Sequence, residues 1–285
     1  MRSLISPFLN NPFMTRSLIA GILVAVSCSI AGTFVVLRGL AFLGDALAHG
    51  VLPGVAGALL LGAPGVLGAA VGAGLMIGGV NLVTRKSRLS SDTAIGLLFV
   101  GMLGLGVMMV SRSTSFTGDI VGILFGEILG VSRSDIVQQA IALVVVGVFA
   151  RVFARPLLML SFDPEQADIA GWPSRRFETL LLLMVTVCVV MSFQTVGTLL
   201  VFGMLLAPAG TGALIARRVW AMMAWGALFG SLSVWAGLLI SYHFDLAAGA
   251  SVVVVAVALF FVVFTIQAVR ESLAQRRTGS VAPVG

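Results

Sequence analysis

Two ionisable side chains stand four residues apart in a very apolar part of the chain. Asp45 and His49 lie in the run 44–54, and Pro53 follows the histidine by four residues. In an α-helix, residues i and i+4 share one face about 6 Å apart along the axis, so the carboxylate and the imidazole can reach one ligand. This donor pair suits a borderline divalent ion such as Zn²⁺ or Mn²⁺ and is too nitrogen-rich for Ca²⁺ or Mg²⁺.

Pro53 supports a site here, because proline lacks the N–H that would bond the carbonyl of His49 and its ring crowds that oxygen. A bent helix with a freed carbonyl beside ionisable groups is typical of the broken helices that line transport pathways. Three other interpretations stay open. Asp45 could cap the second span, His49 could be a hydrogen-bonded structural residue, or the pair could relay protons, since histidine titrates near neutral pH.

The composition indicates an integral membrane protein. Of 285 residues, 59% are hydrophobic and only 10% are charged, and the mean hydropathy is +1.12. A soluble domain carries roughly a quarter charged residues. The apolar runs are about twenty residues long and lack period-two alternation, which predicts an all-α, polytopic helical membrane protein rather than a barrel. In such a chain, an ionisable pair at membrane depth is a functional-site hypothesis by default.

Nine apolar runs are long enough to span a bilayer. The break between the sixth and seventh runs is placed at Gln194, and 113–131 is expected to be a re-entrant or interfacial segment on the outer side. Glu127 in that segment faces either a water-filled cavity or open water. No cleavable signal peptide is evident. The predicted spans are 17–37, 43–61, 65–84, 92–111, 134–153, 177–193, 195–216, 219–241 and 247–269.

The basic residues set the orientation. With the C-terminus inside, only four of the 17 Lys and Arg residues fall on the outer side, which leaves thirteen inside and satisfies the positive-inside rule. An odd number of spans then puts the N-terminus outside. The net charge of +6 is thereby attributed to orientation rather than to nucleic-acid binding. The four outer residues are Arg2, Arg16, Arg112 and Arg133.

Lysine and cysteine usage argues against a Walker loop and against a disulfide or a metal site at the cysteines. The single lysine, Lys86, does not follow a glycine-rich turn, so the chain has no Walker loop and any ATP must be hydrolysed by another chain. Cys28 and Cys188 each lie inside an apolar run, where a free thiol behaves as a small hydrophobe.

A two-turn helix is predicted in the longest cytoplasmic connection, 154–176. The helix begins with an N-cap aspartate, a proline at the first helical position and two residues that suit the positive end of the helix dipole. It ends at a glycine and a proline. So short a helix is marginal alone in water. It therefore packs either on this chain's own helix ends or on a cytosolic partner. In chain order these residues are Asp163, Pro164, Glu165, Gln166, Gly171 and Pro173.

Three further residues are weaker candidates. His243 and Asp245 lie in a short outer-side turn and either accept a cation at the entrance or belong to a solvated loop. Pro208 is expected to bend the seventh span and to form a hinge.

Three blocks of the chain resemble the permease subunits of bacterial zinc- and manganese-type ABC importers. The blocks are 38–54, 161–167, and 196–201 with 206–209, and the similarity runs over 14–270. The first block is specific, whereas the third is mostly aliphatic. The resemblance implies one transmembrane permease domain over 1–285, with an interfacial N-terminal segment at 1–15 and a flexible cytoplasmic tail at 271–285.

The resemblance also implies roles for residues and partners. Asp45 and His49 would hold the transported ion, and 161–171 would be a coupling helix that faces an ATPase. The expected partners are a cytosolic ATPase subunit that binds ATP, an extracytoplasmic metal-binding protein, a second permease copy (the same or a related chain) and the lipid bilayer. No permanently bound cofactor is expected. The coupling residues would be Phe162, Asp163, Pro164, Glu165, Gln166, Ala167 and Gly171.

The resulting hypothesis is a non-enzymatic permease of the bacterial plasma (inner) membrane that conducts Zn²⁺ or Mn²⁺ inward. The alternative is a proton-coupled secondary transporter of divalent metals that works without an ATPase. A membrane metalloprotease is a poor fit, because that site needs two histidines and a glutamate on one helix, and this chain has 2 histidines, about two hundred residues apart.

Overall fold

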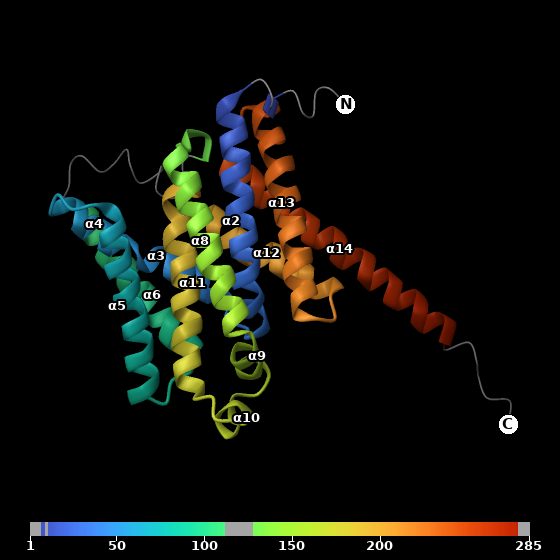
Figure 1. Ribbon diagram of the computed structural model, residues 1–285, viewed down its shortest axis with the longest axis horizontal. Coiled ribbons are helices and arrows are strands. Elements are labelled where there is room, and N and C mark those ends of the chain that lie inside the picture. Colours follow the sequence, from blue (N-terminus) through green and yellow to red (C-terminus); the bar gives the residue numbers. More distant parts are fainter. Residues whose placement is uncertain (1–6, 9–10, 112–127, 279–285) are drawn as a thin grey trace.

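The computed structural model describes residues 7–8, 11–111 and 128–278, which are helical over nearly their whole length and contain no strand (Figure 1). The all-α prediction is therefore confirmed. The helices are α2 (Pro12–Leu37), α3 (Ala41–Gly50), α4 (Leu52–Leu60), α5 (Gly65–Lys86), α6 (Ser91–Val110), the 3₁₀ turn η1 (Ile128–Gly130), α8 (Arg133–Val152), α9 (Ala154–Phe162), α10 (Pro164–Ile169), α11 (Ser174–Val196), α12 (Thr198–Ile215), α13 (Val219–Phe244) and α14 (Ala248–Thr278).

Within the described ranges, eight helical segments are long and apolar enough to cross a membrane, with α3 and α4 together forming one of them. The apolar part of α12, Leu200–Ile215, is shorter. These segments correspond to the nine predicted runs. They alternate in direction, so that α2 begins near the top of Figure 1 and the connections α5–α6 and α9–α10 lie at the bottom. The lower side is therefore the arginine-rich side that the sequence assigns to the cytoplasm.

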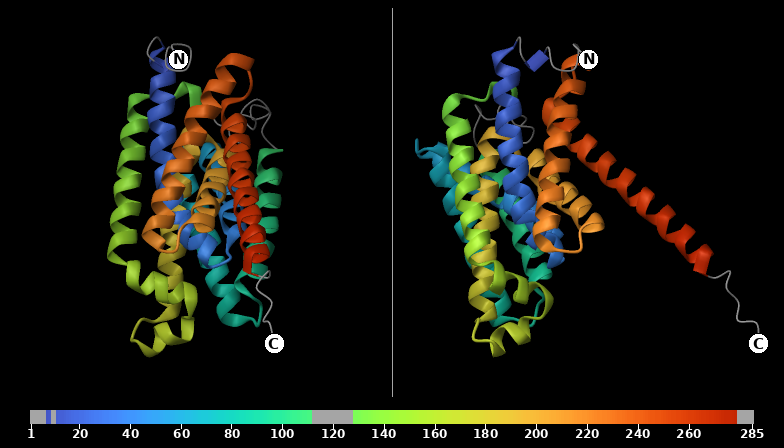
Figure 2. Two further views of the ribbon diagram at one scale, coloured as in Figure 1. Left: turned by 90° about the vertical axis from the view of Figure 1, so that its right-hand side faces the viewer. Right: turned by 45° about the vertical axis from the view of Figure 1, so that its right-hand side comes forward.

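The core is built around α2, which packs against α8, α11, α12 and α13. Small residues permit the close approach. A Cβ on Gly32 of α2 would lie 2.9 Å from the carbonyl carbon of Leu205 in α12, closer than side-chain atoms normally come. The first part of α14 packs on α12 and α13, and its remainder diverges from the bundle (Figure 2).

Two predicted boundaries differ from the structure. The chain turns between α11 and α12 at Gly197, which has φ +78° and ψ 165°, and not at Gln194. That backbone conformation is open essentially only to glycine, whereas a polar glutamine is compatible with a helix. Helix α14 continues to Thr278, so the predicted tail from 271 begins as helix. Glu127 lies outside the described residues.

Candidate metal-binding site

Asp45 and His49 face one another on α3. Asp45 Oδ1 lies 3.4 Å from His49 Nε2, and the two side chains are 27% and 21% exposed. Asp45 stands in the middle of α3 rather than at its start, so the interpretation of this residue as a helix cap is wrong. The geometry leaves a carboxylate and an imidazole directed at one point at the surface of a largely buried helix.

In the part of the chain that the structure describes, the second ring nitrogen of His49 has no polar partner. Nδ1 is buried and makes no hydrogen bond among the described residues. The ring instead packs edge-on against Phe99, with centroids 5.6 Å apart. A structural histidine normally has its buried nitrogen satisfied. Asp45 is thus the one polar contact recorded for this imidazole in the described part of the chain.

The opposite face of α3 anchors the helix. Gly44 sits against Leu205 and Phe202 of α12, where a Cβ would lie 2.6 Å from Leu205 Cδ2. Leu43 and Leu47 are buried. Since one face is locked into the core, the Asp45–His49 face is held in a fixed direction.

The helix that carries the pair is interrupted at Val51, two residues after His49. α3 ends at Gly50 and α4 begins at Leu52, with Pro53 as its second residue. The sequence predicts a free His49 carbonyl, but the N–H of Val51 is directed to this carbonyl as well as to that of Leu47. The interruption does not remove every backbone partner, since the carbonyl of Val51 accepts a hydrogen bond from the N–H of Val55 at 3.0 Å.

α4 rests closely on α5 through glycines. A Cβ on Gly54 would lie 2.7 Å from the amide nitrogen of Gly72, and a Cβ on Gly68 would lie 2.6 Å from Ala58 Cβ. This crossing fixes the second half of the broken span.

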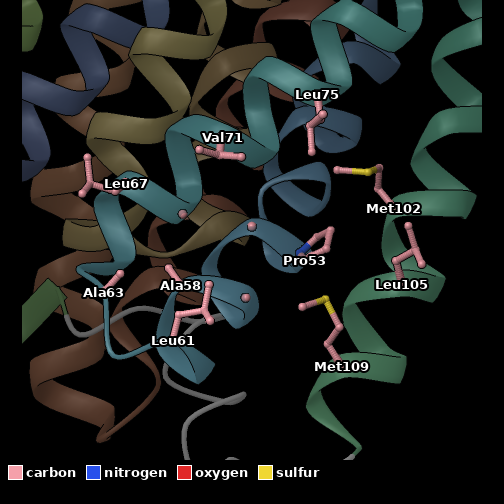
Figure 3. Close-up of a pocket in the computed structure, with 13 residues that line it drawn as sticks. Pro53, Ala58, Leu61, Ala63, Leu67, Val71, Leu75, Met102, Leu105 and Met109 are labelled. Carbon is pink, nitrogen blue, oxygen red and sulfur yellow. The ribbon is translucent and has the colours of Figure 1, made fainter.

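An apolar groove of about 480 Å³ opens between α4, α5 and α6 (Figure 3). Pro53, Val71, Met102 and Leu105 are among its lining residues, and Asp45 and His49 are not. The groove is therefore separate from the ionisable pair.

The weaker candidates do not join the pair. His243 Nδ1 is 2.9 Å from the carbonyl oxygen of Leu239 on its own helix, and Asp245 adopts a left-handed conformation with φ +51° at the α13–α14 turn. Pro208 lies inside α12, which continues past it. In the described part of the chain, no group of three or more His, Cys, Asp or Glu side chains is placed to hold a metal ion.

The α9–α10 segment adopts the short helix that its sequence predicts. Asp163 Oδ1 accepts hydrogen bonds from the N–H groups of Glu165 (3.0 Å) and Gln166 (3.1 Å) at the start of α10. Gly171 has φ +82°, and the N–H of Trp172 returns to the carbonyl of Ala167 at 2.9 Å. That pair of features is a Schellman ending.

Asp168 is a residue that sequence reasoning missed. Its carboxylate accepts hydrogen bonds from the N–H (2.6 Å) and the hydroxyl (2.8 Å) of Ser174, the first residue of α11. These hydrogen bonds, backbone first, hold the pKa of the Asp168 carboxyl below its usual value, and Arg175 adds to the effect. Asp168 therefore ties the α9–α10 segment to the start of α11. The available signal was an acidic residue six positions before a helix-starting serine.

The same segment exposes large apolar side chains. Phe162 is 73% and Ile169 is 86% exposed. Phe162 also borders a hollow of about 230 Å³ together with Met159 and Gln166. Such exposed apolar groups at the end of a bundle favour contact with another protein.

Two pairs of residues far apart in sequence meet in the structure. Arg38 Nη2, at the end of α2, lies 3.6 Å from Glu178 Oε1 of α11. Cys28 and Cys188, expected to be separate small hydrophobes, are buried free thiols whose Sγ atoms are 3.8 Å apart.

These features define a polytopic helical membrane protein of the transport class, with an ionisable pair on a broken transmembrane helix and a structured segment at its arginine-rich end. The chain belongs to the ABC 3 transport family, whose model matches residues 10–267.

Individual relatives agree with that assignment. The chain is 38% identical over 257 residues to "Manganese transport system membrane protein MntC" of Halalkalibacterium halodurans, which covers 90% of this chain and 88% of the relative. It is 36% identical over 255 residues to "Manganese import system permease protein ScaB" of Streptococcus parasanguinis, covering 89% and 90%. The solved structure of "PsaBC from Streptococcus pneumoniae in complex with Fab" matches with a TM-score of 0.81 and 34% identity, over 92% of this chain and 94% of that one.

Proposed function

We propose that this chain is the membrane-spanning permease subunit of an ATP-driven importer of a divalent transition metal, with Mn²⁺ as the first candidate and Zn²⁺ as the second. The observation that carries the proposal is the 3.4 Å approach of Asp45 Oδ1 to His49 Nε2 on a broken transmembrane helix. The names of the relatives support manganese. The chain forms no covalent bond itself, and ATP is hydrolysed by a separate ATPase chain.

The pair supplies two ligands of complementary kind. The Asp45 carboxylate provides a hard oxygen, which Mn²⁺ accepts, and the His49 imidazole provides a nitrogen, which suits Mn²⁺ or Zn²⁺ better than the oxygen-preferring Mg²⁺ and Ca²⁺. An arriving cation replaces the contact between the two side chains, since it attracts the carboxylate and takes the lone pair of Nε2. The remaining ligands come from water, from main-chain carbonyls or from a second permease copy.

The α9–α10 segment is the proposed contact for the ATPase. Phe162 and Ile169 present apolar groups, and Asp163 and Gly171 fix the two ends of the helix between them. In this proposal the chain lies in the inner membrane of a bacterium, and an extracytoplasmic binding protein delivers the ion on the opposite side.

The test replaces each proposed ligand by alanine. In Asp45→Ala and His49→Ala we expect Mn²⁺ binding by the purified protein to weaken by at least ~10-fold, because even the loss of an outer-shell partner typically costs 10–100-fold in affinity. ATP-dependent Mn²⁺ uptake by the complete transporter in proteoliposomes should fall with it. The matched control is His243→Ala, which removes the chain's other histidine and should leave both measurements within about twofold of wild type.

Two results would contradict the proposal. Wild-type binding and uptake in both alanine variants would remove Asp45 and His49 from the site. Uptake by the wild-type chain alone, driven by a proton gradient without ATP, would instead favour the secondary transporter.

A further inference from the structure

The start of α11 is tied to three other parts of the molecule within two helical turns. Asp168 of the α9–α10 segment holds the N–H of Ser174, Arg38 pairs with Glu178, and Thr179 donates from Oγ1 to Asn81 Oδ1 of α5 at 3.2 Å. A displacement of the first turn of α11 therefore acts on all of these contacts together.

The Arg38–Glu178 contact lies at the inner entrance to the helix that carries the metal-binding pair. Arg38 ends α2, Gly39 turns the chain with φ +66°, and α3 begins at Ala41. Asp45 follows one turn further along α3. The guanidinium thus lies at the cytoplasmic start of the helix from which a transported cation would leave.

The environment of the pair makes it sensitive to separation. Arg38 is 15% and Glu178 is 29% exposed, so both charges are partly withdrawn from water. Nη1 of Arg38 is buried and has no hydrogen-bond partner within the described residues. Breaking the contact leaves a poorly solvated guanidinium without its counter-charge, a penalty that the paired state avoids. The pair therefore favours one closed arrangement of α2, α3 and α11.

We infer that Arg38 and Glu178 form an inner latch of the transport pathway, which rests on the proposed function. In the closed state the ion pair holds the cytoplasmic end of α2 and the start of α3 against α11. When a partner moves the α9–α10 segment, the Asp168–Ser174 contact transmits the movement to α11 and separates the ion pair. The start of α3 is then released from α11, which opens a path for the cation that leaves Asp45 and His49.

The experiment measures ATP hydrolysis and Mn²⁺ uptake by the complete transporter in proteoliposomes. We expect Arg38→Gln and Glu178→Gln to raise the ATP hydrolysed per Mn²⁺ imported at least fivefold, because hydrolysis continues while the latch no longer coordinates release. The exchanged double variant, Arg38→Glu with Glu178→Arg, should return that ratio to within twofold of wild type. The matched control is Arg88→Glu, an exposed charge reversal on the α5–α6 connection.

The ratio separates a latch from a merely structural ion pair. If Mn²⁺ uptake and ATP hydrolysis fall together in the glutamine variants, so that their ratio is unchanged, the latch is overturned. ATP-dependent uptake by the wild type would still uphold the proposed function. Absence of ATP-dependent uptake in the wild type would overturn the proposed function and the latch with it. If the glutamine variants do not fold, the exchanged variant provides the test, because it keeps an ion pair between positions 38 and 178. A ratio of ATP hydrolysed to Mn²⁺ imported that is raised above the wild-type value in this variant overturns the inference.

Discussion

Replacing Gly68 by alanine tests whether the crossing of α4 and α5 holds the broken span in place. A Cβ at this position would lie 2.6 Å from Ala58 Cβ and 2.8 Å from the carbonyl carbon of Gly54. Ordinary contact begins at 3.4 Å, so the two helices must separate by about 1 Å. The opposing atoms belong to the backbone and to a short side chain, which have no rotamer that makes room.

The magnitude follows from that separation. A gap of 0.5–1 Å forfeits roughly a quarter to a half of each dispersion contact along the interface, and an added methyl in a packed interior costs about 1–3 kcal/mol. Because backbone cannot yield, we expect about 3 kcal/mol, a factor of roughly 100 in the ratio of folded to unfolded protein. Since α4 continues from α3 through Val51, the displacement should also weaken Mn²⁺ binding at His49.

The assay is the apparent melting temperature of the purified protein in detergent. Gly68→Ala should lower it by roughly 6–12 °C, at 2–4 °C per kcal/mol for a domain of this size class. The control is Gly74→Ala on the same helix, where a Cβ meets nothing within 4 Å and alanine improves helix propensity. A Gly68→Ala protein that melts within about 2 °C of wild type would show that this contact is not tight and would refute the reasoning.

Two further substitutions test the ends of helices. Asp168→Asn should weaken the connection between α10 and α11 at neutral pH, which we expect to see as faster hydrogen exchange at the Ser174 amide. The pKa of Asp168 is lower in the folded protein, so its stabilising contribution is present above the ordinary pKa of 3.8 and is lost as the pH falls below that value. The exchange rate of the wild type should therefore approach that of the variant only in acid. Gly197→Ala should lower the free energy of unfolding by about 1–3 kcal/mol, because φ +78° with ψ 165° suits glycine alone. The melting temperature should then fall by several degrees. The control Gly147→Ala, where a Cβ on α8 meets nothing within 4 Å, should leave the melting temperature unchanged.

Local chemistry made much of the fold predictable. The all-α architecture followed from apolar runs of spanning length, and α10 followed from a capping aspartate and a terminating glycine that act within a few residues. Polarity alone places this turn at Gln194, whereas the chain turns at Gly197. The deciding property is the backbone conformation of Gly197, which the neighbouring Val196 and Thr198 do not reveal.

The candidate site was predictable only where its residues are close in sequence. Asp45 and His49 are one helical turn apart, so their approach followed from helix geometry alone. Arg38 and Glu178 lie on helices that meet through the packing of α2 against α11, and no local pattern indicates that contact. The Asp168–Ser174 hydrogen bonds are partly predictable, because the two residues are close in sequence but are joined by a turn whose direction depends on Gly171.

The openness of the Asp45–His49 site has a functional consequence. A resident metal in a structural site is enclosed by a full set of protein ligands, whereas the described part of this chain brings no third His, Cys, Asp or Glu side chain to Asp45 and His49. A transport site must bind well enough to admit the ion and weakly enough to release it. A two-residue pair, completed by groups that can leave, meets that requirement. A stronger protein cage here would favour retention over transport, so adding a third ligand to α3 should raise Mn²⁺ affinity and slow uptake.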